Sequence, residues 1–184
     1  MSLLESEFYH QIQSVNDVIP AIETWDPPFS GDMECLIKRD GSWWIENSKI
    51  SNDKLIRLFS TVLKYEDDDY FLVTPVEKWR IRVEDLPFLV VELNIAHLGT
   101  GEQTIEARTN VGDRVTIDND HRIATSPIRG LTGDQSIPFV HIRSNLMARF
   151  NRNTYLEIAN LMRSQSNSNH YSLLSADTIF TLGF

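Results

Sequence analysis

The sequence contains almost no cysteine: Cys35 is the single thiol among 184 residues. One thiol cannot close a disulfide within the chain, which excludes a disulfide-stabilised secreted domain. A zinc site would have to use histidine and carboxylate ligands alone. Cys35 alternates with Met33 and Ile37 in an apolar, strand-like pattern, so we expect a small buried residue rather than a nucleophile.

Long apolar runs are also absent. The longest stretch, Phe88 to Val91, ends at Glu92, whereas a membrane-spanning helix needs ~20 apolar residues. The first residues show no basic start followed by an apolar run, so the sequence predicts no secretory leader. We therefore expect a cytoplasmic protein.

The motifs of common enzymes are missing too. The chain has no lysine-containing phosphate loop, no glycine-rich dinucleotide fingerprint, no nucleophile elbow and no His-Glu-x-x-His zinc motif. The five histidines do not pair at the spacing of metal ligands on a helix. The sequence therefore favours a protein without catalysis, metal or cofactor, and a hydrolase that uses Glu77 or His141 is the weaker alternative.

Positive charge is lacking at the start of the chain. Residues 1–37 hold seven acidic side chains and no lysine or arginine, and they supply most of the formal net charge of −9. Such a distribution argues against coating a nucleic-acid duplex or binding an anionic membrane, since both need clustered cations. The ten basic residues after Lys78 are all arginine, a side chain that can bind carboxylate or phosphate through two hydrogen bonds.

The patterns that are present predict few helices. Apolar residues at helical spacing predict an amphipathic helix over residues 3–15. A second helix is expected to begin near Ser51. Ser144 is expected to cap a third helix, which continues to about Arg163. These helices flank a long middle region with a different periodicity.

That middle region is rich in β-type patterns at hairpin-like spacing. Asp40-Gly41 between two such runs is a strong hairpin signal. Strand, acidic-glycine turn, strand and later helix occur twice, first from Glu34 and again from Glu106, which hints at a duplication. Further strands are predicted over residues 70–74, 76–83, 88–95, 104–108, 114–117 and 138–142.

Two pairs of side chains are candidates for binding an anion. His141 and Arg143 are two residues apart in a predicted strand, so they are expected to share a face. Arg80 and Arg82 share a strand face in the same way. Either pair can hold a phosphate, or can instead form ion pairs with acidic residues on neighbouring strands.

Two adjacent tryptophans form another candidate feature. Trp43 and Trp44 point to opposite faces of the predicted hairpin, so one of them can belong to the core. The other is then covered or exposed, and an exposed tryptophan beside arginine can stack on a base. We choose Trp43 as the candidate stacking wall.

The order of seven short motifs over about residues 30–160 resembles DUF1285, a bacterial family of unknown function. The motifs end with the arginine-rich start of the last helix. The other six are Asp40-Gly41-x-Trp43, Leu58-Phe59-Ser60, Leu72-Val73-Thr74-Pro75-Val76-Glu77, Val83-Glu84-Asp85-Leu86-Pro87-Phe88, Arg108-Thr109-Asn110-Val111-Gly112-Asp113 and Pro138-Phe139-Val140-His141-Ile142-Arg143.

The resemblance implies an α+β protein of two related α/β modules produced by duplication. Each module is a mostly antiparallel sheet with a helix, and the second is pleckstrin-homology-like in outline. On this basis we expect an N-terminal helical segment at 1–28, modules at 29–82 and 83–164, and a polar linker with a C-terminal docking strand at 165–184. The resemblance also implies a cleft between the modules for a nucleotide-like ligand, with a signalling rather than a catalytic role.

We therefore predict a ligand-binding or signalling module that takes a small anionic or nucleotide-like molecule. The predicted ligand-binding residues combine donors, an orienting carboxylate and a stacking ring. They are Trp43, Glu77, Arg108, Asn110, His141 and Arg143. The alternative is a protein-interaction adaptor without a small-molecule ligand, with a protein partner or a second copy docked through the tail from Tyr171 to Phe184.

Overall fold

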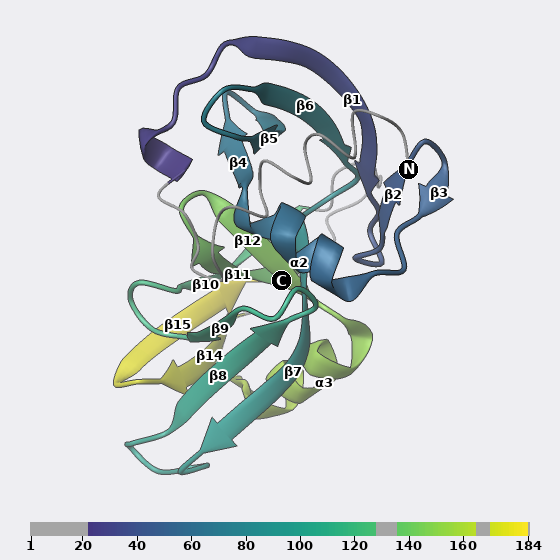
Figure 1. Cartoon of the computed structure of the whole chain (residues 1–184). Helices are drawn as coiled ribbons and strands as arrows, with labels where there is room; N and C mark the ends of the chain where they lie inside the picture. The colour runs from purple at the N-terminus through teal and green to yellow at the C-terminus, as the bar shows by residue number, and fades with distance from the viewer. Residues whose placement is uncertain (1–21, 128–135, 165–169, 184) are drawn as a thin grey trace. The chain divides into compact units, whose positions relative to one another are not determined.

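A computed structural model describes residues 22–127, 136–164 and 170–183 (Figure 1). The chain divides into two compact units. Unit 1 holds residues 1–38 and 42–84, and unit 2 holds residues 39–41 and 85–184. The amphipathic helix expected over residues 3–15 lies outside the described residues.

Unit 1 is built on sheet A, a six-stranded sheet with the order β3-β2-β1-β6-β5-β4. The central strands β1 and β6 are parallel, and the other neighbours are antiparallel. Asn52 caps α2, because its side chain accepts hydrogen bonds from the backbone N–H groups of Lys54 and Leu55. The elements are η1 (Ile22–Thr24), β1 (Phe29–Ile37), β2 (Trp43–Ile45), β3 (Ser48–Lys49), α2 (Asp53–Thr61), β4 (Leu63–Glu66), β5 (Asp69–Val73) and β6 (Lys78–Val83).

Unit 2 contains sheet B, with the order β10-β11-β12-β7-β8-β9, which curls into a half-barrel. Its central strands β7 and β12 are parallel. A smaller sheet, β13-β14-β15, follows the helix α3. The elements are β7 (Phe88–Ala96), β8 (Thr104–Thr109), β9 (Arg114–Thr116), β10 (Ile123–Pro127), β11 (Ser136–Arg143), β12 (Leu146–Phe150), α3 (Arg152–Leu161), β13 (Arg163–Ser164), β14 (His170–Ser175) and β15 (Thr178–Gly183).

Sheets A and B share one connectivity. In each, the first three strands form a meander, the last three form a second meander, and the first and sixth strands pair in parallel at the centre. The expected duplication and the α+β class are therefore confirmed. The helices differ in position, because α2 lies between the third and fourth strands of its unit and α3 follows the sixth. In unit 2 the corresponding link is a tight turn, in which Asp118 Oδ1 accepts from the backbone N–H groups of Asp120 and His121.

The internal repeat has a different register from the expected one. The counterpart of the β1–β2 hairpin is the β7–β8 hairpin, which turns between residues 97 and 103. The Gly112-Asp113 turn, which the sequence pattern aligned with Asp40-Gly41, joins β8 to β9 instead. The Asp40-Gly41 turn and the Gly112-Asp113 turn both combine an acidic residue with glycine, so local turn chemistry alone could not distinguish them.

The prediction that Ser144 caps the last long helix was wrong. Ser144 has a positive φ of 46° in the turn between β11 and β12, and α3 begins at Arg152 behind the cap residue Asn151. The buried positions of β12 explain the difference: Leu146, Ala148 and Phe150 alternate, which is the two-residue period of a strand. The alternating burial identifies residues 146–150 as a strand, although the same apolar residues also fit helical spacing.

The core of each unit is formed by apolar side chains on the inner faces. Cys35 is fully buried in unit 1, as expected, and burial raises the pKa of its thiol to about 12. The C-terminal tail forms the β14–β15 hairpin, and Leu173 and Leu182 are buried. None of the helices in the described ranges is long and apolar enough to cross a membrane.

Candidate functional site

The six predicted ligand-binding residues belong to two different units. Trp43 and Glu77 lie in unit 1. The other four lie in unit 2: Arg108, Asn110, His141 and Arg143. Their roles as ligand contacts stay predictions, but the structure gives each side chain a definite environment.

Trp43 is the core tryptophan of the hairpin. Its side chain is 0% exposed and its ring centroid lies 6.4 Å from that of Phe59 on α2. Trp44, the next residue, points to the opposite face and remains half-buried. Of the two tryptophans, Trp44 rather than the chosen Trp43 is therefore the one whose ring is partly accessible.

Glu77 lies in the turn between β5 and β6, where it serves local structure. Its carboxylate Oε2 accepts a hydrogen bond of 3.3 Å from Trp79 Nε1. Its backbone exchanges hydrogen bonds with Thr74, whose N–H donates to the Glu77 carbonyl at 2.8 Å and whose hydroxyl accepts from the Glu77 N–H at 3.1 Å. The carboxylate thus orients an indole of its own unit.

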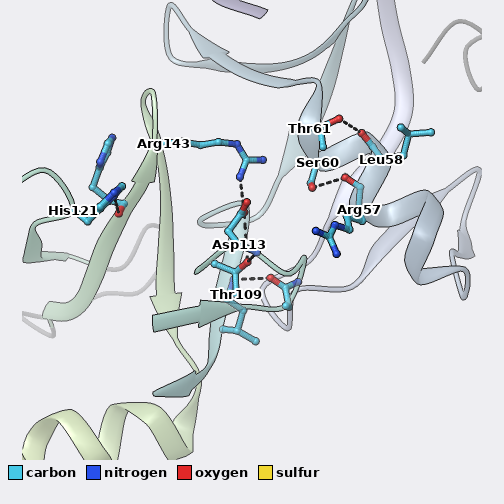
Figure 2. Close-up of polar contacts among 11 residues, drawn as sticks. Arg57, Leu58, Ser60, Thr61, Thr109, Asp113, His121 and Arg143 are labelled. Atoms are coloured by element: carbon cyan, nitrogen blue, oxygen red, sulfur yellow. Dashed lines mark hydrogen bonds and ion pairs between the residues drawn. The ribbon is translucent and has the colours of Figure 1, made fainter. Parts of the chain in front are cut away.

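Arg143 forms an ion pair with Asp113 in the turn between β8 and β9 (Figure 2). The two side chains are only 15% and 17% exposed. The guanidinium also lies 4.9 Å from the ring centroid of Phe88. A β-bulge between His141 and Arg143 interrupts the strand alternation, so the expected sharing of one face does not follow from their spacing.

Asn110 holds two backbone segments together within unit 2. Its Oδ1 accepts a hydrogen bond of 2.9 Å from the N–H of Leu89, and its Nδ2 donates one of 3.0 Å to the carbonyl oxygen of Gly41. The side-chain amide thereby uses both its acceptor and its donor on main-chain groups. Asn110 lies in the β8–β9 turn, and Arg143 binds Asp113 of the same turn.

Arg108 and His141 have other partners. Arg108 Nε donates to a carboxylate oxygen of Glu92 on β7, and this hydrogen bond holds the pKa of Glu92 below its usual range. One ring nitrogen of His141 lies 3.0 Å from the carbonyl oxygen of Asp120, and the other faces the carbonyl oxygen of Ser144. Both side chains are therefore committed within unit 2.

A different group of side chains surrounds a cavity on the outer face of sheet A, which we name the sheet A pocket. The cavity has a volume of about 190 Å³. Strand register places its centre: Leu36 on β1 pairs with Trp44 on β2 and with Arg82 on β6, so the three side chains form one row. The pocket is lined by Glu34, Leu36, Lys38, Trp44, Asn47 and Arg82.

Lys38 and Trp44 are coupled at one side of this pocket. Lys38 Nζ lies 3.6 Å from the ring centroid of Trp44, a cation–π contact. The Trp44 indole is fixed by a 2.8 Å hydrogen bond from Nε1 to the hydroxyl of Ser42. The tight β2–β3 turn supplies Asn47, at a positive φ of 61°.

The cations of this sheet face fall into two classes. Arg80 is held between Asp32 and Asp69, and the hydrogen bonds that its guanidinium donates to these carboxylates, Asp32 first, raise its pKa. Lys64 and Lys78 both bind Glu66. Lys38 and Arg82, in contrast, form no ion pair with any residue that the structure describes. They line the sheet A pocket, where Glu34 is the acidic side chain among the described lining residues.

Sequence reasoning found Trp44 and Arg82 as members of open alternatives, but it missed Lys38 and Asn47 as candidate site residues. One signal was available for Lys38: it follows Leu36 at strand spacing, while the buried Cys35 and Ile37 occupy the other face. No sequence signal showed that β1 and β6 are neighbours, because their pairing is parallel and 45 or more residues separate the partners.

The comparisons with known proteins all lead to one family. The model of the DUF1285 N-terminal domain matches residues 20–86, and that of the C-terminal domain matches residues 87–182. A DUF1285 family protein from Silicibacter pomeroyi DSS-3 has a similar crystal structure, with 31% identity, a TM-score of 0.85, and coverage of 96% of this chain and 94% of that chain. One from Shewanella baltica OS155 has 26% identity and a TM-score of 0.51 over 70% of this chain and 91% of that chain. No curated protein matches the chain.

Proposed function

The chain belongs to the DUF1285 family, and from this premise we propose that it is a ligand-binding module that holds a small phosphate- or carboxylate-bearing anion in the sheet A pocket. One observation carries the proposal. On a face where Lys64, Lys78 and Arg80 bind carboxylates of the protein, Lys38 and Arg82 line a cavity without such a partner among the described residues.

Charge supports an anionic ligand. An arginine already bridged to carboxylates must lose those bonds to bind a ligand, whereas Arg82 can offer its paired N–H donors directly. Lys38 adds a second positive charge, and its contact with Trp44 fixes where that charge lies. Glu34 at the rim partly offsets these two cations, which favours a compact anion bound close to both of them.

Size limits the ligand further. Pockets that enclose drug-sized molecules measure ~300–1,000 Å³, and the sheet A pocket has about 190 Å³. It can enclose a phosphate or carboxylate group with a short body. A nucleotide would place its phosphate end there and leave its base outside the cavity. Of the nucleotide-like ligand that the family resemblance implies, only the anionic end would therefore fit inside the sheet A pocket.

Thermal unfolding of the full chain with inorganic phosphate tests the proposal. At a concentration ~100 times Kd, binding stabilises the native state by about 2.7 kcal/mol, or roughly 5–10 °C in Tm for a chain of this length. We expect this shift in the natural protein, measured against sodium chloride of equal ionic strength. We expect Arg82→Gln and Lys38→Gln to lose it.

Arg80→Gln is the matched control, because Arg80 lies on the same strand face but is held by Asp32 and Asp69. Its Tm without phosphate is expected to fall, yet the phosphate-induced shift should persist. Equal shifts in the natural protein and in Arg82→Gln would contradict the proposed site.

The alternative, a protein-interaction adaptor, stays a prediction. The tail that it would use is the β14–β15 hairpin, whose Leu173 and Leu182 are buried. The same hairpin exposes Ile179 and Tyr171, so it also offers apolar surface to a partner. The adaptor therefore stays an alternative to the small-ligand proposal.

A further inference from the structure

Unit 2 contains a second, larger cavity, which we name the Arg122 groove. It has a volume of about 630 Å³ and lies along β10, β11 and β12, with β15 at one side. We infer that this groove binds a small monocarboxylic acid with an apolar body. The inference concerns residues of unit 2 alone, so it does not depend on the sheet A pocket.

The floor of the groove is apolar and set by strand register. Ala124 on β10 pairs with Phe139 on β11, and His141 on β11 pairs with Met147 on β12. Phe139 and His141 are two residues apart on one strand before the bulge, so the two cross-strand pairs are neighbours on one face. All four side chains are half-buried, which leaves ring and thioether surface in contact with the cavity.

Among the described residues that line the groove, the arginine is Arg122 and the carboxylate is Asp120. Arg122 is exposed, and its backbone carbonyl accepts a 3.1 Å hydrogen bond from the N–H of His141, which places the residue at the end of the floor. Its guanidinium forms no ion pair within the part of the chain that the structure describes. Four other arginines of the unit each bind a carboxylate: Arg108, Arg114, Arg143 and Arg149.

Two other polar side chains of the groove, Asp120 and His141, favour a carboxylate over a phosphate. Asp120 also lines the groove, and its negative charge opposes a doubly charged ligand more than a singly charged one. His141 contributes ring surface rather than free donors, because its two nitrogens face the carbonyl oxygens of Asp120 and Ser144. One guanidinium matches one carboxylate through two parallel hydrogen bonds.

The volume fits an apolar body beyond the carboxylate. About 630 Å³ lies within the ~300–1,000 Å³ range of small-molecule sites. An acid such as 3-phenylpropionate can place its ring on Phe139 and Met147 while its carboxylate meets Arg122. For a ligand of this size, we expect a Kd of roughly 0.1–1 mM.

Calorimetric titration of the full chain with 3-phenylpropionate tests the inference. We expect saturable binding that weakens at least ~10-fold in Arg122→Gln, since one charge-assisted pair is lost. The neutral analogue 3-phenylpropanol should bind at least ~10-fold more weakly to the natural protein for the same reason. Arg122 is exposed, so its substitution is expected to leave Tm unchanged.

Two control variants separate this groove from other cationic sites. Arg114→Gln removes another exposed arginine of unit 2, and Arg82→Gln removes the arginine of the sheet A pocket. Both are expected to keep the natural Kd within ~twofold, since neither touches the groove. Absence of saturable binding, equal binding of 3-phenylpropanol, or loss of binding in Arg82→Gln but not in Arg122→Gln would overturn the inference. Loss of binding in Arg82→Gln alone would place the acid in the sheet A pocket and so support the proposed function, whereas the other two results leave phosphate binding in unit 1 untouched.

Discussion

Replacing Arg143 with alanine is expected to destabilise unit 2 by about 2–3 kcal/mol, whereas Arg108→Ala is expected to cost less than about 1 kcal/mol. From the sequence alone, both arginines were predicted as ligand-binding residues, with nothing to distinguish them. The structure separates them through burial: the Arg143–Asp113 pair is 15% and 17% exposed, and the Arg108–Glu92 pair is 37% and 52% exposed.

The magnitude for Arg143 follows from its partners. Removing one member of a fully buried pair costs ~3–5 kcal/mol, because the other charge stays buried without compensation. Asp113 retains some solvent contact, and the Thr109 hydroxyl still donates a 3.5 Å hydrogen bond to its carboxylate oxygen Oδ2, which lowers the cost. Loss of the contact between the guanidinium and the buried ring of Phe88 adds about 1 kcal/mol.

Urea unfolding at neutral pH measures the two costs. The midpoint of the Arg143→Ala transition should fall well below that of Arg108→Ala, with the slope unchanged. Asp113→Ala and the double variant complete a mutant cycle, in which we expect a coupling energy of about 1–3 kcal/mol. Equal midpoints for the two single arginine variants would refute the reasoning, since burial would then not decide the energy of the pair. Arg143 would in that case again be a candidate ligand contact.

Two further predictions concern a turn and the buried thiol. Gly41 has φ +79°, and a Cβ there would lie 2.8 Å from Asn110 Nδ2. Gly41→Ala should therefore lower the free energy of unfolding, measured in urea, by about 2–3 kcal/mol. An equal loss in the Asn110→Ala background would contradict the clash. Cys35, with a pKa raised to about 12, should resist thiol reagents at pH 8 until the protein unfolds. Because the folded protein favours the neutral thiol, its contribution to stability is complete below pH ~9 and falls as pH rises toward 12; a Cys35→Ala variant with the same decline in unfolding free energy would contradict this.

The sequence predicted the α+β class because strand alternation and hairpin turns are local signals. The duplication, in contrast, was implied by the family resemblance and only hinted at by an internal repeat whose register was wrong. Asp40-Gly41 indicated its hairpin correctly, since φ is positive at that glycine. The prediction at Ser144 failed because residues 146–150 fit two periodicities, and packing against the parallel strand β7 selects the strand. A local pattern cannot report a partner more than 50 residues away.

The candidate sites depended on such distant partners even more strongly. Arg80 and Arg82 are equivalent in sequence, yet Asp32 and Asp69 from two neighbouring strands bind only the first of them. The tryptophan pair shows the same limit: the alternation of Trp43 and Trp44 is local, but which face is the core depends on where α2 packs. At both positions, the sequence did not show which elements are neighbours in the fold.

The placement of the acidic residues explains how some cations form no ion pair among the described residues, although the chain has nine more acidic than basic charges. Seven of the acidic side chains lie in the first 37 residues, and Asp67 and Asp68 form the turn between β4 and β5. Acidic groups gathered in one segment or in a turn do not meet every cation on the sheet faces. Lys38, Arg82 and Arg122 form no ion pair among the described residues, and Asp69, which the β5–β6 register brings opposite Arg82, binds Arg80 instead. An arginine that bridges two strands would have to release its carboxylate before it could bind a ligand, at a cost that is largest for a buried pair such as Arg143–Asp113. Ligand binding is therefore expected at the cations that form no ion pair among the described residues.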